Sequence, residues 1–512
     1  MPISRILKIS GFMTAVAFLA VAVGCGGAGV VIPHTTGNYS NASFKGSYVY
    51  EIHGTFVDST PYREAGVITA DGKGNITGGV DGFANSNTGG AIQSSASVTG
   101  TYTIASDGTG QILLGSTGLG TLASVSQISL AVTLASTSKA ALMEADVFAS
   151  GAGTAELQTA TAISSAPNGT FVFRMHQEID AQNSTSASQV GFFTIASGSL
   201  SSGSMDQNLF PVGSSLLTLT GGTFSAPTSL GTGTGSFTDS SPFTTNFFYY
   251  IVNNAKFVLL ASNPGAVGSG SAELQSGAVS SGLQGAYAFG SSGDDFQVNL
   301  KNDVATVGEF TGSGATISAG QLDALQDGTN YSQDVAFTGT ATTATNNPSP
   351  QGRVQVTLSG TGISVPVIAW MVSPTRAFFL ENLTTRAEDG TADLQTTTSF
   401  SAATFKGQFA FLMNGIDTSP EGLARIGTLQ FDGSSKLTLV ELANASQSGS
   451  GAVPPGAMAG TYQVGSGGRF TGSVSNGGGG LDVVGYAVSG SQAYLLQVDP
   501  GTNTSGTIQL QQ

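Results

Sequence analysis

A histidine beside a nucleophile and an acid would give this chain hydrolytic chemistry, because a catalytic triad uses the imidazole as its base. The sequence holds three histidines, His34, His53 and His176. His53 and His176 each follow the glycine of a recurring motif by seven residues, but the same position in the two later copies holds Ser292 and Asn414. No histidine is therefore kept at this position, and we interpret the histidines as surface or rim residues.

A short phrase that recurs four times could supply the paired carboxylates of a glycosidase. It reads GTAELQ at 153–158, GSAELQ at 270–275, GTADLQ at 390–395 and GTIQLQ at 506–511. Its acid position holds Glu156, Glu273, Asp393 and Gln509. A glutamine cannot exchange a proton in this role, and in a strand Glu156 and Gln158 face one side while Ala155 and Leu157 face the other. We expect the acids to be outward polar side chains on the closing strand of a domain.

Metal binding finds little support in the residue types. One cysteine and three histidines cannot build a zinc site of the usual nitrogen and sulfur type. The stretch Asp71-Gly72-Lys73-Gly74-Asn75 begins like a calcium loop, but Gly72 and Lys73 interrupt the alternating oxygen ligands and no glutamate follows at the right distance. We interpret it as a hairpin turn, with weak calcium binding at acidic turns left open. The sequence thus predicts no catalytic residue, no cofactor and no metal ligand.

Aromatic side chains could stack on sugars, and the candidates are Trp370 and the pairs Phe247-Phe248 and Phe378-Phe379. Each lies in a stretch that is typical of a buried hairpin. Large aromatic side chains in such hairpins usually form the core. We expect these residues to be core residues.

The composition indicates an all-β protein without affinity for nucleic acid. The net charge is −15 and no basic cluster occurs beyond the first few residues, whereas binding to nucleic acid needs lysine and arginine against phosphates. Only 9% of the residues are charged, and 73 glycines separate short apolar runs. Short apolar runs with frequent turn residues are typical of β-strands.

The N-terminus has the pattern of an export signal. Arg5 and Lys8 precede an apolar run from Ile9 to Val23, which is too short to span a membrane comfortably. A basic start, a short apolar core and small residues before a break predict a signal peptide over residues 1–24.

The break at Val23-Gly24-Cys25 resembles the lipobox of bacterial lipoproteins, although Ala22 stands where that family usually has leucine. The resemblance implies that Cys25 is lipidated and becomes the first mature residue. Because no aspartate follows Cys25, it also implies the outer membrane. Residues 25–43 then form the lipidated cysteine and a flexible tether, which includes His34. The alternative is cleavage after Ala22, which would leave Cys25 as a free thiol.

A second motif recurs with the closing phrase and divides the chain into four copies. It reads FKGSYVY at 44–50, PNGTFVF at 167–173, LQGAYAF at 283–289 and FKGQFAF at 405–411. Both motifs keep nearly one period. We predict four β domains, at 44–160, 167–277, 282–397 and 404–512.

Within each copy the pattern predicts about eight antiparallel strands. Alternate residues from Phe44 to Ile52 share one face, and tight turns are expected at Asp71-Gly72, Asp107-Gly108, Asn253-Asn254 and Asp432-Gly433. No convincing amphipathic helix occurs beyond the signal peptide. An up-and-down barrel is favoured over a sandwich, because closure removes exposed strand edges.

The chain also resembles uncharacterised tandem β-repeat lipoproteins of acidobacterial soil bacteria, which carry F-x-G-x-Y-x-F and G-x-x-x-x-D-G-x-G-x-x elements. These elements occur, with small variations, at 44–50, 405–411 and 66–76. The resemblance implies a secreted β-protein and supplies no activity.

We therefore expect a non-catalytic cell-envelope lipoprotein that binds at a surface or has a structural role. Its expected partners are the membrane, through Cys25, and an envelope glycan, a protein or a small apolar ligand. One alternative is a lipocalin-like or avidin-like protein that holds a small ligand inside its barrels. A less favoured alternative is an enzyme acting on extracellular polysaccharide.

Overall fold

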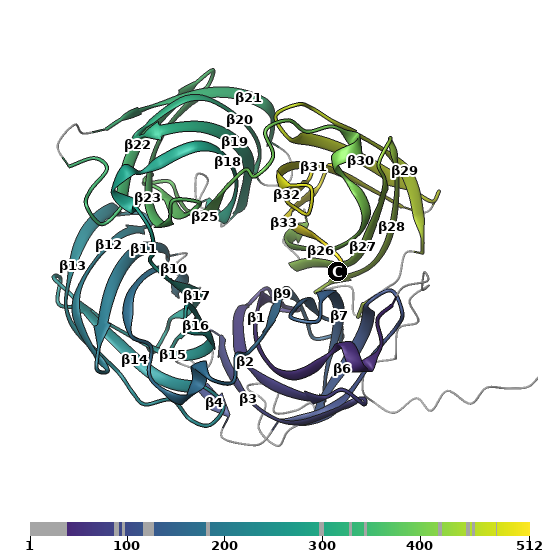
Figure 1. Ribbon diagram of the computed structural model, residues 1–512, viewed down its shortest axis with the longest axis horizontal. Coiled ribbons are helices and arrows are strands. Elements are labelled where there is room, and N and C mark those ends of the chain that lie inside the picture. Colours follow the sequence, from purple (N-terminus) through teal and green to yellow (C-terminus); the bar gives the residue numbers. More distant parts are fainter. Residues whose placement is uncertain are drawn as a thin grey trace, which may run out of the picture.

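The computed structural model describes residues 38–85, 92–94, 98–115, 127–180, 185–295, 302–326, 330–342, 346–417, 422–446, 451–452, 456–477 and 479–512. The predicted signal peptide, Cys25 and His34 lie outside the described residues. The described chain forms four closed antiparallel barrels of eight strands each, as Figure 1 shows. The predicted fold class, four tandem barrels rather than sandwiches, is confirmed.

Each barrel is a meander in which neighbouring strands follow one another in the chain. Barrel 1 contains β1 (Lys45–Phe56), β2 (Pro61–Asp71), β3 (Asn75–Asn85), β5 (Thr99–Ile104), β6 (Thr109–Gly115), β7 (Ile128–Ser136), β8 (Lys139–Glu144) and β9 (Ala149–Leu157), and the short β4 (Ile92–Ser94) pairs with β3. Barrel 2 contains β10 (Gly169–Asp180), β11 (Thr185–Ala196), β12 (Ser199–Leu209), β13 (Gly213–Phe224), β14 (Thr232–Asp239), β15 (Thr244–Asn253), β16 (Lys256–Ala261) and β17 (Val267–Leu274).

Barrels 3 and 4 repeat this order. Barrel 3 contains β18 (Leu283–Asp295), β19 (Asn302–Gly314), β20 (Thr316–Gln326), β21 (Asn330–Ala341), β22 (Arg353–Gly360), β23 (Ile363–Ser373), β24 (Arg376–Glu381) and β25 (Arg386–Leu394). Barrel 4 contains β26 (Lys406–Asp417), β27 (Gly422–Asp432), β28 (Lys436–Ala445), β29 (Met458–Val464), β30 (Arg469–Ser475), β31 (Gly480–Ser489), β32 (Gln492–Gln497) and β33 (Thr502–Leu510). A short 3-10 helix precedes the first strand of each barrel: Asn41–Ser43, Ala162–Ser164, Val279–Ser281 and Ala402–Thr404.

The interior of each barrel is filled by the apolar face that alternation predicts. In barrel 1, Phe44, Tyr48, Tyr50 and Ile52 are buried in one cluster. The other three barrels bury equivalent aromatic clusters. Packed aromatic rings therefore fill much of the described interior of each barrel.

The motif glycine and the closing leucine touch in every barrel. Gly46 has a φ of +114°, and a Cβ there would lie 2.7 Å from Leu157 Cδ1. A residue with a side chain would be strained at this backbone angle and would also collide with the leucine. The same contact joins Gly169 to Leu274, Gly285 to Leu394 and Gly407 to Leu510. This contact explains why the two sequence motifs recur together.

The acidic turns are hairpins. Asp71 Oδ1 accepts hydrogen bonds from the main-chain N–H groups of Lys73 (2.6 Å) and Asn75 (3.0 Å) between β2 and β3. A side-chain bond from Asn75 and these main-chain bonds lower the pKa of Asp71 to about 2. Asp432 is held in the same way between β27 and β28. The hairpin interpretation is confirmed, because the carboxylates are used within the turns.

The closing glutamine of each barrel binds the barrel that follows it. Gln158 Nε2 donates hydrogen bonds to the main-chain oxygens of Leu230 (2.9 Å) and Ile251 (2.7 Å) in barrel 2. Equivalent bonds run from Gln275 to Gln351 and Met371, and from Gln395 to Gly467 and Ala487. We call each region where two neighbouring barrels meet, including this contact, a joint.

The closing glutamine of barrel 4 binds barrel 1. Gln511 Nε2 donates to the main-chain oxygens of Asp107 (2.9 Å) and Leu134 (2.6 Å). The main-chain N–H of Gln512 donates to Ala135 O at 3.0 Å. The four barrels therefore form a closed ring (Figure 1), in which the last joint repeats the other three without a covalent linker.

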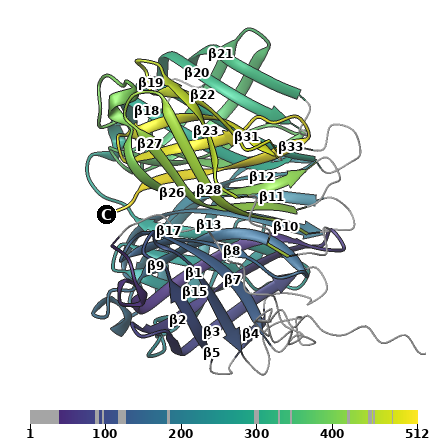
Figure 2. The same cartoon turned by 90° about the vertical axis from the view of Figure 1, so that its right-hand side faces the viewer.

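Apolar side chains on the outer walls of the barrels seal all four joints. Each cluster combines residues of two neighbouring barrels: Val67 and Tyr250 for barrels 1 and 2, Val190 and Trp370 for barrels 2 and 3, Val307 and Tyr486 for barrels 3 and 4, and Ile426 and Met143 for barrels 4 and 1. Figure 2 shows the barrels stacked side against side from a second direction. Such outer-wall burial stabilises the ring in the same way that a core stabilises a domain.

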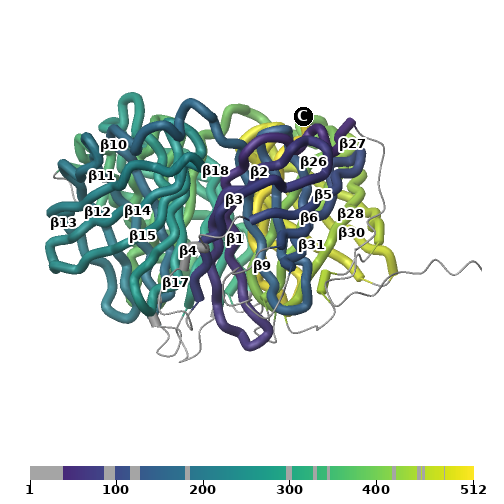
Figure 3. The backbone as a smooth tube through the Cα atoms, turned by 90° about the horizontal axis from the view of Figure 1, so that it is seen from below, coloured from purple at the N-terminus to yellow at the C-terminus, as the bar shows by residue number. Residues whose placement is uncertain are grey.

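The ring has two unlike faces. The linker face, with the C-terminus at the top of Figure 3, carries the four joints and the tight hairpin turns. The opposite loop face carries the connections at 57–60, 145–148, 210–212 and 240–243. Five exposed apolar side chains lie in these loop-face connections: Val57, Val147, Phe148, Val212 and Phe243.

The N-terminal segment reaches the linker face. Residues Tyr39–Ser43 belong to the range expected to be a flexible tether, but Tyr39 packs against the core of barrel 1 and Asn41–Ser43 form a capped 3-10 helix. Tyr39 N–H donates to Ser106 O at 3.0 Å. The described chain thus enters the ring beside its last joint.

Candidate functional site at the centre of the ring

The first and last strands of the barrels surround the central axis of the ring (Figure 1). Their outward side chains include the positions that the sequence singled out: His53 and Glu156 in barrel 1, His176 and Glu273 in barrel 2, Ser292 and Asp393 in barrel 3, and Asn414 and Gln509 in barrel 4. The sequence motifs therefore converge in space, although each copy contributes different side chains.

The acids of the closing phrase form ion pairs between barrels. Glu156 of barrel 1 binds Lys256 Nζ of barrel 2. Glu273 of barrel 2 binds Arg376 of barrel 3, with 2.8 Å between Oε2 and Nε, and Arg376 also binds Asp393 of its own barrel at 2.7 Å. We call this series of contacts the belt. It ends at barrel 4, where Tyr494 donates its hydroxyl to Asp393 Oδ2 at 2.6 Å.

These acids point away from the barrel interiors, as expected, but they lie between barrels and not on an open surface. Their partners Lys256 and Arg376 follow hairpin turns, and the sequence analysis did not identify them. Each is the first residue of the seventh strand of its barrel, and an apolar run follows it. That repeated placement is the signal that could have identified them.

A cavity of about 140 Å³ opens at this belt and is lined by three barrels. Its charged lining residues are Glu51, Glu156, Arg174, Lys256, Glu273 and Arg376. Three acids and three bases balance there, so the cavity offers no net charge to a ligand. The pairs stabilise the ring centre instead.

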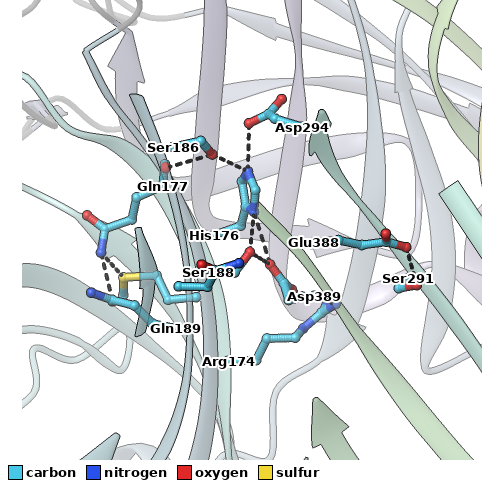
Figure 4. A network of polar contacts seen from close by, with 12 residues as sticks. Arg174, His176, Gln177, Ser186, Ser188, Gln189, Ser291, Asp294, Glu388 and Asp389 are labelled. Carbon is cyan, nitrogen blue, oxygen red and sulfur yellow. Dashed lines mark hydrogen bonds and ion pairs between the residues drawn. The ribbon is translucent and has the colours of Figure 1, made fainter. Parts of the chain in front are cut away.

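His176 lies between two aspartates of the next barrel (Figure 4). Its Nδ1 is 3.0 Å from Asp389 Oδ2, and its Nε2 is 3.2 Å from Asp294 Oδ2. Ser188 Oγ lies 3.2 Å from Nδ1 and donates to Asp389 Oδ2 at 2.9 Å, and Ser186 Oγ lies 3.2 Å from Nε2. This network joins barrel 2 to barrel 3.

A serine, a histidine and an aspartate therefore meet, but the protonation state of the histidine favours ion pairs with the aspartates and not activation of a serine nucleophile. Burial by itself lowers the pKa of His176, yet the hydrogen bonds and charges of Asp294 and Asp389 raise it to about 9. At neutral pH the imidazolium donates to both aspartates and cannot accept a proton from a serine. Ser188 is also fully buried at 0% exposure.

The two histidines of the described chain have different surroundings. His53 is exposed, and its main-chain oxygen accepts a hydrogen bond from Asn414 Nδ2 at 3.2 Å. The His176 side chain is 18% exposed and lies in an interface, so it is not the rim residue that we expected. The sequence could not reveal this place, because Asp294 and Asp389 lie in another copy of the repeat.

The aromatic candidates divide between cores and joints. Phe247 and Phe379 lie in the cores of barrels 2 and 3, whereas Phe378 and Trp370 are buried where these two barrels meet. Trp370 Nε1 donates to Asp206 Oδ2 at 2.9 Å. The expectation of core residues is confirmed for Phe247 and Phe379, whereas Phe378 and Trp370 lie between barrels 2 and 3.

Two joints contain a buried ion pair that the sequence analysis did not identify. Asp206 of barrel 2 accepts from Arg353 Nε and Nη2 of barrel 3, both at 2.7 Å. Asp323 of barrel 3 accepts in the same way from Arg469 of barrel 4, at 2.7 and 2.9 Å. The forked guanidinium geometry fixes the orientation of one barrel on the next.

Within the described ranges, no group of three or more histidine, cysteine, aspartate or glutamate side chains is placed to hold a metal ion. Among the same residues, no helix is long and apolar enough to cross a membrane.

No protein-family model and no curated protein matches the chain. Among solved structures, the chain has a match to a Trp-176-Ala mutant of the vaccine antigen Transferrin Binding Protein B from Haemophilus parasuis Hp5. That match has 10% identity and a TM-score of 0.18, and it covers 74% of this chain and 85% of the other. The class that the structure defines is a closed ring of four eight-stranded antiparallel barrels.

Proposed function

We propose that the protein is a non-catalytic lipoprotein of the bacterial cell envelope, in which the ring serves as a rigid platform. In this proposal Cys25 carries the lipid, the segment before Tyr39 is the tether, and the outer membrane is the site of attachment. The loop face binds an envelope glycan or a protein.

The observation that carries the proposal is the one-sided construction of the ring. The joints, the C-terminus and the point where the N-terminal segment enters all lie at the linker face. The exposed apolar side chains Val212 (76% exposed) and Phe243 (54% exposed) lie at the opposite face. A chain anchored through its N-terminus would therefore present the loop face away from the membrane, and exposed apolar groups are typical of binding surfaces.

The paired charges at the ring centre support a structural role for that region. His176 is held as an imidazolium, and the acids of the closing phrase are neutralised by Lys256 and Arg376. Catalytic groups need a pKa near the working pH and access to substrate. The pKa of His176, raised to about 9, does not suit a general base, which supports binding rather than catalysis.

Labelling of introduced cysteines on cells tests the orientation. Val212→Cys places a thiol on the loop face, and Lys73→Cys places one on an exposed turn of the linker face. We expect a bulky maleimide to label Val212→Cys faster than Lys73→Cys in the membrane-attached protein. The two rates should become equal in a Cys25→Ser background, which we expect to be released from the membrane fraction.

Two results would refute the proposal. Retention of the Cys25→Ser variant in the membrane fraction would contradict the proposal that a lipid on Cys25 anchors the protein. Faster labelling of Lys73→Cys in the attached protein would reverse the orientation.

A further inference from the structure

The interior of barrel 1 contains four buried acids at its loop-face end. Glu64 on β2, Asp81 on β3 and Glu144 on β8 share a strand face with core residues and therefore point into the barrel. Asp146 follows in the connection from β8 to β9. Each of the four residues is at most 4% exposed. We call them the acid group of barrel 1.

The lysine and arginine residues of this copy lie elsewhere. They are Lys45, Arg63, Lys73 and Lys139. The three lysines are exposed, and Arg63 lies on the outward face of β2, 3.3 Å from Glu178 Oε1 of barrel 2. Residues 86–91, 95–97 and 116–126 of the sequence contain no titratable side chain. The acid group therefore has no base of its own copy beside it.

The other side chains that face this interior are apolar or tyrosines. Tyr50 and Tyr62 lie among the acids, whereas Tyr48 and Tyr102 bind main-chain oxygens at the linker-face end. The outer wall of barrel 4 that packs against this end presents the neutral Asn444 and apolar side chains. No described neighbour thus supplies a positive charge to the acid group.

Barrel 4 holds a base and an acid at two of the same positions. By strand register, Arg425 corresponds to Glu64, and Glu441 corresponds to Asp81. Arg425 Nη1 donates to Glu441 Oε1 at 2.8 Å. Barrel 1 therefore has a second carboxyl group where barrel 4 has a guanidinium.

Hydrogen bonds satisfy only part of the acid group. The Tyr50 hydroxyl donates to Asp81 Oδ1 at 2.7 Å and lies 3.2 Å from Glu64 Oε1. Three further polar atoms form no hydrogen bond: Glu144 Oε1, Asp146 Oδ2 and the Tyr62 hydroxyl. A buried carboxylate without donors is costly, because it has lost its water and gained no partner. Such an interior favours neutral carboxyl groups.

The protonation of the acids follows from this environment. Burial, together with the neighbouring acids, raises the pKa of Glu64 and of Glu144 well above the ordinary value of 4.5. Burial also raises the pKa of Asp81, to about 6, although the hydrogen bonds of Tyr50 and Glu64 oppose this rise. The stability that depends on protonated Glu64 and Glu144 is complete at acidic pH and is lost as the pH rises toward their raised pKa values.

The connection between β8 and β9 joins the acid group to barrel 4. Asn444 Nδ2 donates to three main-chain oxygens of this region: those of Glu144 (2.8 Å), Asp146 (3.2 Å) and Ala149 (2.8 Å). The Ser150 hydroxyl donates to Asn444 O at 2.5 Å. These bonds belong to the joint between barrels 4 and 1, which has no covalent linker. A shift of the connection is therefore transmitted directly to the closure of the ring.

We propose that closure of the ring depends on protons: the ring is closed while Glu64 and Glu144 are protonated, and the joint between barrels 4 and 1 opens when both ionise. Ionisation places repelling charges in an interior without a base. Hydration of these charges requires the connection at 145–148 to move outward, and this movement breaks the bonds of Asn444. The device goes beyond the loop-face platform and does not rest on it.

Energy transfer between dyes on introduced cysteines tests the proposal in the full-length chain, in a Cys25→Ser background. The pair Ser138→Cys and Ser491→Cys spans the joint of barrels 1 and 4. The pair Thr375→Cys and Ser491→Cys spans the joint of barrels 3 and 4, and all three positions lie in equivalent hairpin turns. We expect a loss of transfer in the first pair between about pH 6 and about pH 10, and constant transfer in the second pair. Constant transfer in the first pair, or an equal loss in both pairs, would overturn the proposal.

Variants assign the response to the acid group. Glu64→Gln combined with Glu144→Gln removes both ionisable groups with little change in shape and should abolish the loss of transfer. Glu144→Gln alone should shift the loss to higher pH. Asp58→Asn changes an exposed acid in the connection from β1 to β2 and is the matched control, which should respond as the wild type does.

A further variant tests the route to the joint. Asn444→Ala weakens the joint without changing the acids and should shift the loss of transfer to lower pH. An unchanged profile in Asn444→Ala would contradict the route. A response that persists in the double glutamine variant, or that disappears in Asp58→Asn, would contradict the role of the buried acids, while the labelling experiment on the loop face would stand.

Discussion

Tyr39 and Gln512, at opposite ends of the described chain, are in direct contact: the Tyr39 hydroxyl donates to the main-chain oxygen of Gln512 at 2.9 Å. The same hydroxyl lies 3.1 Å from Ala135 O, which accepts the N–H of Gln512. Tyr39 occupies the place that Phe400 has before barrel 4, since each lies seven residues before its motif glycine. Their N–H groups make equivalent bonds, to Ser106 O and Ser466 O. The last joint is therefore a normal joint with a break in the chain.

Loss of the closing glutamine should open this joint. Gln511→Ala removes two hydrogen bonds to main-chain oxygens of barrel 1 and should lower the free energy of unfolding by about 1–3 kcal/mol. Urea unfolding and the radius of gyration in solution measure the loss of stability and the opening of the ring. Gln512→Ala is the control, because Gln512 is exposed and uses its main-chain N–H. Equal losses in the two variants would contradict the role of the side chain.

A circular permutant should keep the ring. Joining Gln512 to Asn38 through a short linker and opening the chain between Thr397 and Thr398 exchanges the positions of the break and a covalent joint. Because the joints are equivalent, we expect a melting temperature within a few degrees of the wild type. Thermal unfolding measures it, and sedimentation shows whether the permutant remains compact. A permutant that unfolds barrel 4 separately would show that the joints are not equivalent.

The interface of barrels 2 and 3 should weaken at alkaline pH. The pKa of His176 is about 9 in the folded protein, above its usual value near 6.5. Its contribution to stability is therefore complete below about pH 6.5 and is lost as the pH rises through 9. We expect a loss of about 2–3 kcal/mol over this range in the wild type, and a smaller loss in His176→Gln. Urea unfolding at several pH values provides the comparison, and identical pH profiles would contradict the prediction.

Replacing the buried Glu144 by a neutral residue should stabilise barrel 1 at alkaline pH. Burial, with Asp146 beside it, raises the pKa of Glu144 well above its ordinary value, and Glu144 Oε1 forms no hydrogen bond. The stability that comes with a raised carboxyl pKa is present at acidic pH and is lost as the pH rises toward that pKa. Glu144→Gln should therefore match the wild type near pH 5 and exceed it by about 1–3 kcal/mol near pH 9. A variant that is less stable than the wild type at pH 9 would refute this.

The barrels were predictable because a closed lumen imposes a period of two on each strand. Tyr48, Tyr50 and Ile52 lie on one face in the sequence and fill one interior in the structure. The recurrence of the motif glycine together with the closing leucine in all four copies also has a physical cause, since Gly46 and Leu157 touch. Local patterns of this kind are visible in one sequence.

The ring was not predictable from the same patterns. Alternation separates the lumen from the outside of a barrel, but it does not say what covers the outside. Glu156 therefore resembled a solvated side chain, although it binds Lys256 in the next barrel. Outward apolar residues such as Val67 and Val190, together with the repeated Gln158, are the signals that could have indicated barrel–barrel contacts.

Ring closure also constrains how the gene can change. An open array of tandem domains tolerates recombination that adds or removes a copy, because each copy has a free neighbouring surface. Here the bonds of Gln511 to barrel 1 require the fourth copy to return to the first. A chain with three or five copies would leave two apolar outer walls uncovered and would be prone to aggregate. Selection on the geometry of the joints should therefore hold the number of copies at four while the loops of the opposite face diverge.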